Sequence, residues 1–336
     1  MRKSALVILI VMFCFTSVYA NGSKKEISRR FDRKESVEIK LVSGDCTVRT
    51  HDSSEIRVDI IYQDDLEDRV EFNFRERGGT LYMEEDWNHS GSGDIHWIIT
   101  LPGETDVDFS SASGDLQVSG LSGNLEGRTA SGDIVLEGIR GSVDVAVASG
   151  DVEIRKCKGE IEISSASGDI FMENCSGEIE LSTASGDIEA VGIDSKEIEL
   201  HAASGDIDIS ESRGAFEISV ASGEVKAEEI KITGKSEFST ASGEVEIILA
   251  ESPEHNLDLS TASGDILLDY NGNPVKGNFE FTAKKHGGHI KAPFDFDREE
   301  EFEKNGKEYL RKSFRRKNDS PFIYLSTASG SVELRK

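Results

Sequence analysis

Positive charge is scarce in this sequence. Lys and Arg together number 38 among 336 residues, against 64 Asp and Glu, so the formal net charge is −26. A surface of this sign repels nucleic acid and anionic lipid, and we expect neither as a partner. Such acidity can indicate disorder, but β-branched and aliphatic residues alternate with the acids throughout, and that pattern can bury a core.

Long apolar segments are also missing after the first twenty residues. That N-terminal segment has a basic tip (Arg2, Lys3), an apolar run from Ala5 to Phe15 and small residues at Val18 and Ala20. It predicts a signal peptide over residues 1–20 with cleavage after Ala20. No later run approaches the length of a spanning helix, so we expect export to the periplasm, the cell surface or the medium without a transmembrane anchor.

Motifs of enzyme active sites are absent as well. The sequence contains no GxSxG, HExxH or phosphate-loop pattern. Carboxylates are so abundant that chance pairs of them carry little weight. The sequence therefore favours a non-enzymatic protein without a cofactor, and a carbohydrate-active enzyme on a β-helix is the alternative.

What the sequence does contain is a repeat. Between Ala130 and Ala202 one phrase occurs four times, beginning ASGDIVLEGIRGSVDVAV and ASGDVEIRKCKGEIEISS. Each repeat contains the tripeptide Ser-Gly-Asp or Ser-Gly-Glu, which recurs every 18 to 21 residues. Its glycines are at 114, 132, 150, 168, 186, 205, 223, 243 and 264. Each unit holds two short alternating segments separated by turns, and a turn of this kind often requires a positive φ from its glycine.

The repeat predicts an all-β fold, a β-solenoid or β-helix of two-strand coils of about 18 residues, because like units stack on like. An antiparallel β-meander of the same period is the structural alternative. In the unit that begins at Ala130 we expect the inward residues to be Ile134, Leu136, Ile139, Val143, Val145 and Val147.

The sequence divides into segments that differ in how closely they follow the repeat. After the signal peptide we expect a disordered leader over residues 21–30 and irregular capping coils over 31–100. The regular solenoid covers 101–270. Residues 271–336 add C-terminal coils with a charged insertion at about 284–320, and we expect the exposed final strand after Gly330 to end the stack.

The acid after each glycine predicts a ladder of carboxylates along one edge of the rod. We expect each to accept backbone N–H groups of its own turn, as aspartate commonly does. Weak Ca²⁺ binding between coils is the alternative, because hard oxygen ligands suit that ion. The residues concerned are Asp133, Asp151, Asp169, Asp187 and Asp206.

Three cysteines follow the signal peptide: Cys46, Cys157 and Cys175. Cys157 and Cys175 stand one repeat apart, in the column of Ile139 and Ile193. They are interpreted either as small buried hydrophobes or as a disulfide between neighbouring coils, because stacked strands lie about 4.8 Å apart and a bridge can span that separation.

Partner contacts are expected where the repetition fails or where it presents a flat face. The insertion carries the concentrated positive charge, and Trp87 is a candidate for sugar stacking near the other end. His286 and His289 flank two glycines and are interpreted as turn residues and not as a metal pair. The candidate contacts are Trp87, Arg311, Lys312, Arg315 and Arg316, and the outward column includes Glu162, Glu180, Glu199 and Glu217.

The run of SGD units, the strand ending in Leu101-Pro102, the phrase FSSASGDLQVSGLSGNLEGRTASGDI and the closing STASGSVEL resemble the bacterial DUF4097 β-strand-repeat proteins, which carry an adhesin label. The resemblance extends from Val37 to Leu334. It implies a β-helix-like solenoid in an exported or envelope protein, adhesin-like or scaffolding, that binds an unknown envelope protein or glycan. A self-assembling scaffold, in which uncapped coil ends stack head to tail, is a further alternative.

Overall fold

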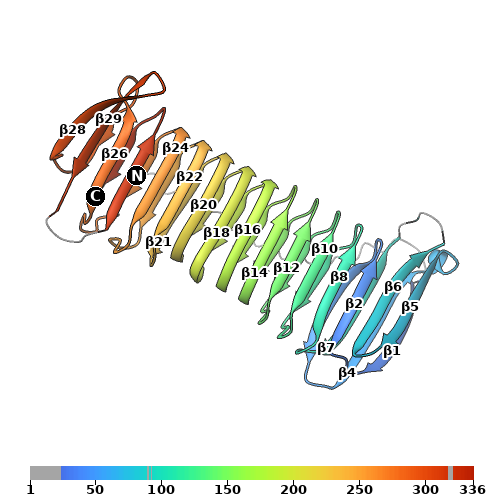
Figure 1. Cartoon of the computed structure of the whole chain (residues 1–336). Coiled ribbons are helices and arrows are strands. Elements are labelled where there is room, and N and C mark those ends of the chain that lie inside the picture. Colours follow the sequence, from blue (N-terminus) through green and yellow to red (C-terminus); the bar gives the residue numbers. More distant parts are fainter. Residues whose placement is uncertain (1–23, 89–90, 92, 317–320) are drawn as a thin grey trace.

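The structure is a computed structural model that describes residues 24–88, 91, 93–316 and 321–336. The signal peptide expected over residues 1–20 lies outside the described residues. The described chain forms one open sheet of 31 strands and a single 3-10 turn, η1 (Asp64–Leu66). None of its helices is long and apolar enough to cross a membrane. Figure 1 shows the strands stacked along a rod, with the chain running from one end to the other.

The sheet is folded into two layers. Layer A consists, in spatial order, of β1 (Lys24–Asp32), β4 (Glu55–Gln63), β7 (Ile95–Pro102), β3 (Asp45–His51), β9 (Leu116–Ser119), β11 (Ile134–Glu137), β13 (Val152–Arg155), β15 (Ile170–Glu173), β17 (Ile188–Val191), β19 (Ile207–Ser210), β21 (Val225–Ile232), β23 (Val245–Leu249), β25 (Ile266–Asp269), β31 (Val332–Arg335) and β27 (Ile290–Lys291).

Layer B consists, in the same direction, of β5 (Val70–Arg77), β6 (Thr80–Trp87), β2 (Ser36–Leu41), β8 (Asp106–Ser111), β10 (Leu125–Thr129), β12 (Val143–Val147), β14 (Lys158–Ser165), β16 (Ser176–Ser185), β18 (Asp194–Ser204), β20 (Arg213–Ser222), β22 (Ser236–Ser242), β24 (Leu257–Ser263), β30 (Phe322–Thr327), β26 (Asn278–Lys284), β29 (Lys307–Phe314) and β28 (Arg298–Lys304).

The central coils stack in parallel and in register, which confirms the solenoid and excludes the meander. Leu125 of β10 pairs with Val143 of β12, and that residue pairs with Ile161 of β14. Equivalent positions of successive repeats therefore form continuous columns. The six residues expected to point inward in the repeat at Ala130 are all buried. Each such aliphatic side chain stabilises the fold by about 1.5–3 kcal/mol through burial.

The first and last coils in the sequence do not lie at the ends of the stack, because another segment of the chain lies outside each of them. Strand β2 lies between β6 and β8, although β6 follows it in the chain. At the other end β30 lies between β24 and β26, and β31 between β25 and β27. The final coil was expected to be an exposed end, and this was wrong, because the segment that precedes it in sequence covers it.

Antiparallel strands and aromatic side chains close both ends. At the N-terminal end β1, β4 and β5 pair antiparallel with their neighbours, and the ring of Phe72 lies 5.5 Å from that of Trp97. At the C-terminal end β29 and β28 do the same, and Phe294 lies 4.8 Å from Phe314. Large rings fill the space that a missing next coil would leave.

The expected disordered leader was wrong for the part that the structure describes. Residues 24–30 belong to β1, which pairs with β4 from Lys24 opposite Gln63 to Asp32 opposite Glu55. Ile27 and Phe31 of this strand pack against the core. Lys24, Glu26, Arg30 and Asp32 occupy the other face of this edge strand, where charge discourages pairing with other chains.

The repeat glycines are required by close stacking at each corner, and Gly150, Gly205, Gly223, Gly243 and Gly264 also have the expected positive φ. A Cβ built on Gly168 would lie 2.0 Å from the carbonyl oxygen of Gly150, in the coil before, although no positive φ is recorded there. The same contact recurs at Gly186, where the distance to the oxygen of Gly168 is 2.2 Å. Any side chain at these corners would force neighbouring coils apart.

We therefore predict that Gly168→Ala lowers the free energy of unfolding by about 2 kcal/mol or more, because overpacking at a backbone contact leaves no flexible atom to move. Gly103→Ala is the matched control, since a Cβ there meets nothing closer than 3.8 Å. It should change stability by less than about 0.5 kcal/mol. Urea unfolding followed by circular dichroism measures both, and equal losses would contradict the stacking argument.

Candidate functional site

The outward face of layer B carries columns of like side chains. Strand β22 shows the pattern, because Glu237, Ser239 and Ala241 point outward while Phe238 and Thr240 are buried. Since the coils stack in register, each of these positions continues along the rod. The face therefore presents a carboxylate column, a hydroxyl column and an alanine column side by side.

The carboxylate column is unbroken over the parallel coils and is bordered by Tyr82 and Tyr324. The outward column expected at Glu162, Glu180, Glu199 and Glu217 is confirmed as part of it. Its members are Glu38, Asp108, Glu126, Asp144, Glu162, Glu180, Glu199, Glu217, Glu237 and Asp258.

Burial, and then the charges of neighbouring carboxylates, raise the pKa of two members of this column. Burial, and then the charges of Glu237 opposing and Lys235 assisting ionisation, set the pKa of Asp258 at about 6, above its ordinary value. Its Oδ1 atom is buried and has no hydrogen-bond partner among the described residues. Desolvation, followed by the charges of Glu217 and Glu180, also raises the pKa of Glu199.

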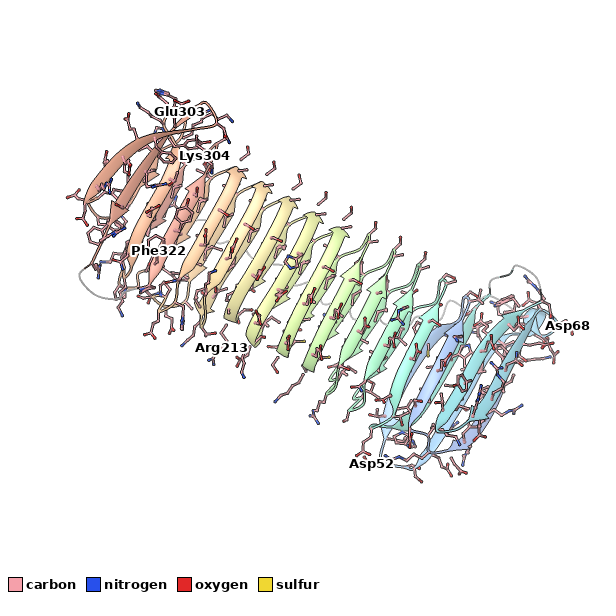
Figure 2. The ribbon with its side chains drawn as sticks, viewed as in Figure 1. Asp52, Asp68, Arg213, Glu303, Lys304 and Phe322 are labelled. Carbon is pink, nitrogen blue, oxygen red and sulfur yellow. The ribbon has the colours of Figure 1, made fainter. Side chains whose placement is uncertain are left out.

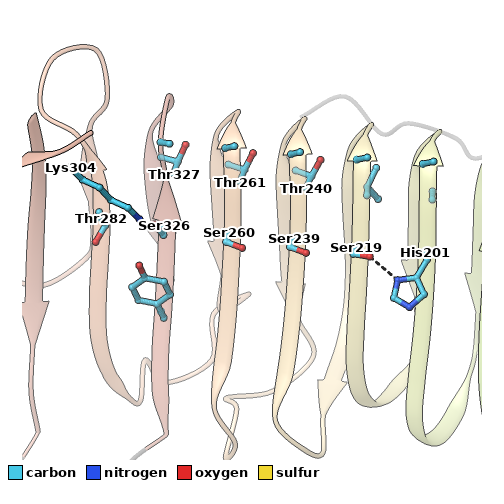
Figure 3. Close-up of a pocket in the computed structure, with 18 of the residues that line it drawn as sticks. His201, Ser219, Ser239, Thr240, Ser260, Thr261, Thr282, Lys304, Ser326 and Thr327 are labelled. Atoms are coloured by element: carbon cyan, nitrogen blue, oxygen red, sulfur yellow. Dashed lines mark hydrogen bonds between the residues drawn. The ribbon is translucent and has the colours of Figure 1, made fainter. Parts of the chain in front are cut away.

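The hydroxyl and alanine columns form the floor of a groove of about 1310 Å³ near the C-terminal end. The row of hydroxyl groups lies beside the row of alanine methyl groups. His201 stands in the hydroxyl column, and its Nδ1 lies 2.6 Å from Oγ of Ser219. Figure 3 shows the hydroxyl groups in a row that crosses successive strands. The floor includes Ser182, Ser219, Ser239, Ser260, Ser326, Ala203, Ala221, Ala241 and Ala262.

The wall of the groove is the hairpin β28–β29. Its two turn residues, Asn305 and Gly306, have φ of 53° and 72°, which suits a two-residue hairpin turn. Phe302 stacks on Tyr309 with ring centroids 5.6 Å apart, and the Arg311 guanidinium lies 4.7 Å from the centre of the Phe302 ring. These three residues face the floor together with Lys304 and Lys307. Figure 2 places Glu303 and Lys304 at the far tip of this end.

The structure separates the four cations expected to contact a partner. Arg311 lines the groove, and its Nε lies 3.3 Å from Glu280. Lys312 points to the other face of β29 and pairs with Glu299 at 2.6 Å. Arg315 and Arg316 lie beyond the strand, where Arg315 lines a smaller hollow of about 360 Å³ and Arg316 donates to the carbonyl oxygen of Val275 at 2.6 Å.

Sequence reasoning missed Phe302, Lys304, Lys307 and Tyr309, which line the groove. The available signal was the Asn305-Gly306 pair between two alternating segments, which strongly favours a short hairpin. With that turn in place, alternation sends every second side chain to the groove and the others to the opposite face.

Trp87 serves the fold at the other end of the rod. Its Nε1 donates to Oε1 of Glu85 at 2.5 Å, and Glu85 also accepts the backbone N–H groups of Ser43 and Gly44. Glu85 is buried, so these bonds satisfy its charge. His89, beside it in sequence, lies outside the described residues. At the C-terminal end Nε2 of His286 lies 3.3 Å from Glu308.

The carboxylates after the repeat glycines connect one coil to the next. Oδ1 of Asp133 accepts the backbone N–H of Asp151 at 2.9 Å, and Oδ1 of Asp151 accepts that of Asp169 at the same distance. The ladder continues through Asp187 and Asp206 to Glu224. The expectation that each carboxylate bonds its own turn was therefore wrong, because the orphan N–H lies one coil away.

The ladder leaves little for a calcium ion to use. One oxygen of each aspartate is committed to a backbone N–H group. Within the part of the chain that the structure describes, no group of three or more His, Cys, Asp or Glu side chains is placed to hold a metal ion. Calcium binding by Asp133, Asp151, Asp169, Asp187 and Asp206 would have to use the other carboxylate oxygen of each, and it stays a prediction.

Cys157 and Cys175 are buried free thiols, so the disulfide that their spacing allowed is not formed. Sγ of Cys157 accepts the N–H of Ile139, and Sγ of Cys175 accepts that of Cys157, each at 3.4 Å. Ser212 makes the equivalent bond to Ile193. The hydrogen bond with Cys157, and then burial, raise the pKa of the Cys175 thiol, which keeps it protonated and unreactive.

We predict that Asp169→Ala lowers the free energy of unfolding by about 1 kcal/mol, because the N–H of Asp187 loses its acceptor. Asp169→Asn keeps an amide oxygen there and should stay within about 0.5 kcal/mol of the parent chain. Thermal melts in Ca²⁺ and in EDTA at matched ionic strength should coincide for all three proteins. A calcium-dependent shift lost in Asp169→Ala would instead establish a metal site.

A second prediction concerns pH. Because the pKa of Asp258 is raised to about 6 in the fold, its protonated form stabilises the fold fully below about pH 4, the unfolded pKa, and this contribution is lost as the pH rises through 6. Asp258→Asn removes that loss. After allowance for solvent screening of this half-exposed group, the variant should gain about 1 kcal/mol over the parent between pH 4 and pH 7. A constant difference across that range, measured by urea unfolding, would refute the assignment.

Comparison with known proteins identifies the family. The model described as Toastrack DUF4097 matches residues 88–189 and again residues 159–289, more than half of the chain. A candidate adhesin of Bacteroides fragilis is 20% identical, covering 73% of this chain and 97% of its own, with a TM-score of 0.40. A candidate lipid-binding protein of Parabacteroides distasonis is 15% identical over 93% and 98%, with a TM-score of 0.35. No curated protein matches. The chain belongs to the Toastrack DUF4097 family.

Proposed function

We propose that this chain is an exported, non-enzymatic binding protein of the bacterial cell envelope, adhesin-like in action, whose groove on layer B holds an extended ligand. The observation that carries the proposal is the groove itself, a hollow of about 1310 Å³ that crosses several coils beneath the hairpin β28–β29. The N-terminal signal segment supports export.

The floor is suited to a polymer. Each coil of the groove adds one methyl group and, except at His201, one hydroxyl group at the strand spacing of about 4.8 Å. A chain that lies along the rod therefore meets the same chemistry at every step, and its contacts act together once the first is made. Hydroxyl groups that donate and accept, beside small apolar patches, match the surface of a glycan.

The lining of the groove supports binding over catalysis. Glycoside hydrolases commonly place two carboxylates on either side of the scissile bond. The described residues that line this groove include cations, hydroxyl groups and aromatic rings but no Asp or Glu. The carboxylate column runs beside the groove, as one regular row and not as a pair across it.

Head-to-tail assembly has little support. The last coil is covered by β26 and β27. The outermost strands β1, β5 and β28 are rich in charge, with sequences KKEISRRFD, VEFNFRER and REEEFEK. Charged edge strands oppose pairing between molecules.

The test is a glycan array read for both binding and product release. We predict binding without turnover, and at least a tenfold loss of affinity in Ala241→Trp, because the exposed Ala241 lies in the floor and a large ring there fills the groove. Ala250→Trp is the control, on an exposed alanine outside the groove. Sedimentation should show one species at all concentrations.

If Ala241→Trp binds glycans as tightly as the parent protein does, the ligand binds to a surface other than the groove, and the proposed site is wrong. Product release that is abolished by one acid-to-amide change would establish the enzyme alternative, and concentration-dependent growth would establish the assembling scaffold.

A further inference from the structure

The part of the hairpin β28–β29 that overhangs the groove presents cations and aromatic rings to it. Alternation places Phe302, Lys304, Lys307, Tyr309 and Arg311 toward the groove. Beyond the groove the same face continues to Glu300, which stands opposite Arg311, and the opposite face carries the acids Glu301, Glu303 and Glu308 together with Lys312. In a chain with a net charge of −26, the groove side of this wall is thus a local concentration of positive charge.

Two of these cations are available to a ligand. Arg311 is engaged by Glu280, and on the outer face Lys285 pairs with Glu301 at 2.6 Å. Lys304 and Lys307 are exposed and form no ion pair with any described residue. Figure 3 shows the Lys304 side chain extending from the hairpin over the sheet toward Ser326.

A buried hydroxyl group without a partner lies at the same end of the groove. Thr282 lines the groove with only 5% of its surface exposed, and its Oγ1 makes no hydrogen bond to any residue that the structure describes. Buried polar groups are nearly always paired, so an orphan here is an available donor for a ligand oxygen. It is independent of the two lysines, because it comes from β26 and not from the hairpin.

The carboxylate column limits how much negative charge the ligand can carry. Glu237 and Asp258 stand two residues before Ser239 and Ser260 on the same outward face. A polymer with a charge on every unit would lie against this row and be repelled. Positive charge is confined to the hairpin end, so the ligand that fits is neutral along the floor and anionic at that end only.

We infer that the groove takes a glycan whose neutral sugars lie on the hydroxyl and alanine columns and whose single acidic sugar sets its carboxylate between Lys304 and Lys307, in the groove that Thr282 also lines. This rests on the proposed function and specifies its ligand. A carboxylate held by two ammonium groups accepts charge-assisted hydrogen bonds, which are stronger than the neutral contacts along the floor. Tyr324 on the floor offers a ring face to a neighbouring sugar.

The probes are sialyllactose, lactose and polygalacturonate, measured by calorimetry on the full mature chain. The parent protein should bind sialyllactose at least tenfold more tightly than lactose, and polygalacturonate more weakly than sialyllactose. In Lys304→Gln/Lys307→Gln the preference for the acidic sugar should disappear while lactose binding is kept. Lys276→Gln/Lys291→Gln, which removes two exposed lysines outside the groove, should leave the preference intact.

Thr282→Val should weaken sialyllactose binding severalfold without changing lactose binding. Absence of a preference for sialyllactose, or an unchanged preference in the Lys304→Gln/Lys307→Gln variant, would overturn the inference. If neutral glycans still bind and Ala241→Trp abolishes that binding, the proposed function stands without it. If polygalacturonate binds best, the ligand is a polyanion and the inference is wrong.

Discussion

The fold depends on how closely one coil can approach the next at the Ser-Gly-Asp corners. At Gly168 the carbonyl oxygen of Gly150 occupies the space that a Cβ would need. The following aspartate then supplies its carboxylate to the backbone N–H one coil on, as from Asp151 to Asp169. Glycine permits the approach and aspartate satisfies the group that the approach leaves unpaired. The two roles meet at each corner from Gly132 to Gly205, and this explains why Ser-Gly-Asp is so uniform there.

The same stacking imposes a cost on the surface. Parallel coils in register align every outward position, so one acid per repeat becomes a continuous row of carboxylates. The row is tolerated because most of its members face water and salt screens them. Where a neighbour or burial removes that screening, as at Asp258, the carboxyl group holds its proton more tightly. A register that is ideal for an apolar core is thus unfavourable for charges.

Period and alternation could be predicted from the sequence, and so could the inward residues such as Ile134 and Val145. The order of the coils could not be predicted, because nothing in the sequence of the last repeat indicates that β30 lies between β24 and β26. The acceptor of each aspartate also required the three-dimensional stack, because its partner is some 18 residues away. The hairpin could have been predicted from the Asn305-Gly306 turn signal, but the many charged residues around this pair made the segment look like an irregular insertion.

The groove requires both the regular and the irregular parts of the chain. The repeats alone make an open floor of hydroxyl and methyl groups, with no end and no preferred position for a ligand. The hairpin β28–β29 alone supplies cations and aromatic rings but no opposing surface against which a ligand could bind. Only where the hairpin folds over the last coils does a defined position along the rod arise. Because insertion of the final coil places β26 and its hairpin at the outer end, the order of the coils decides where the binding site lies.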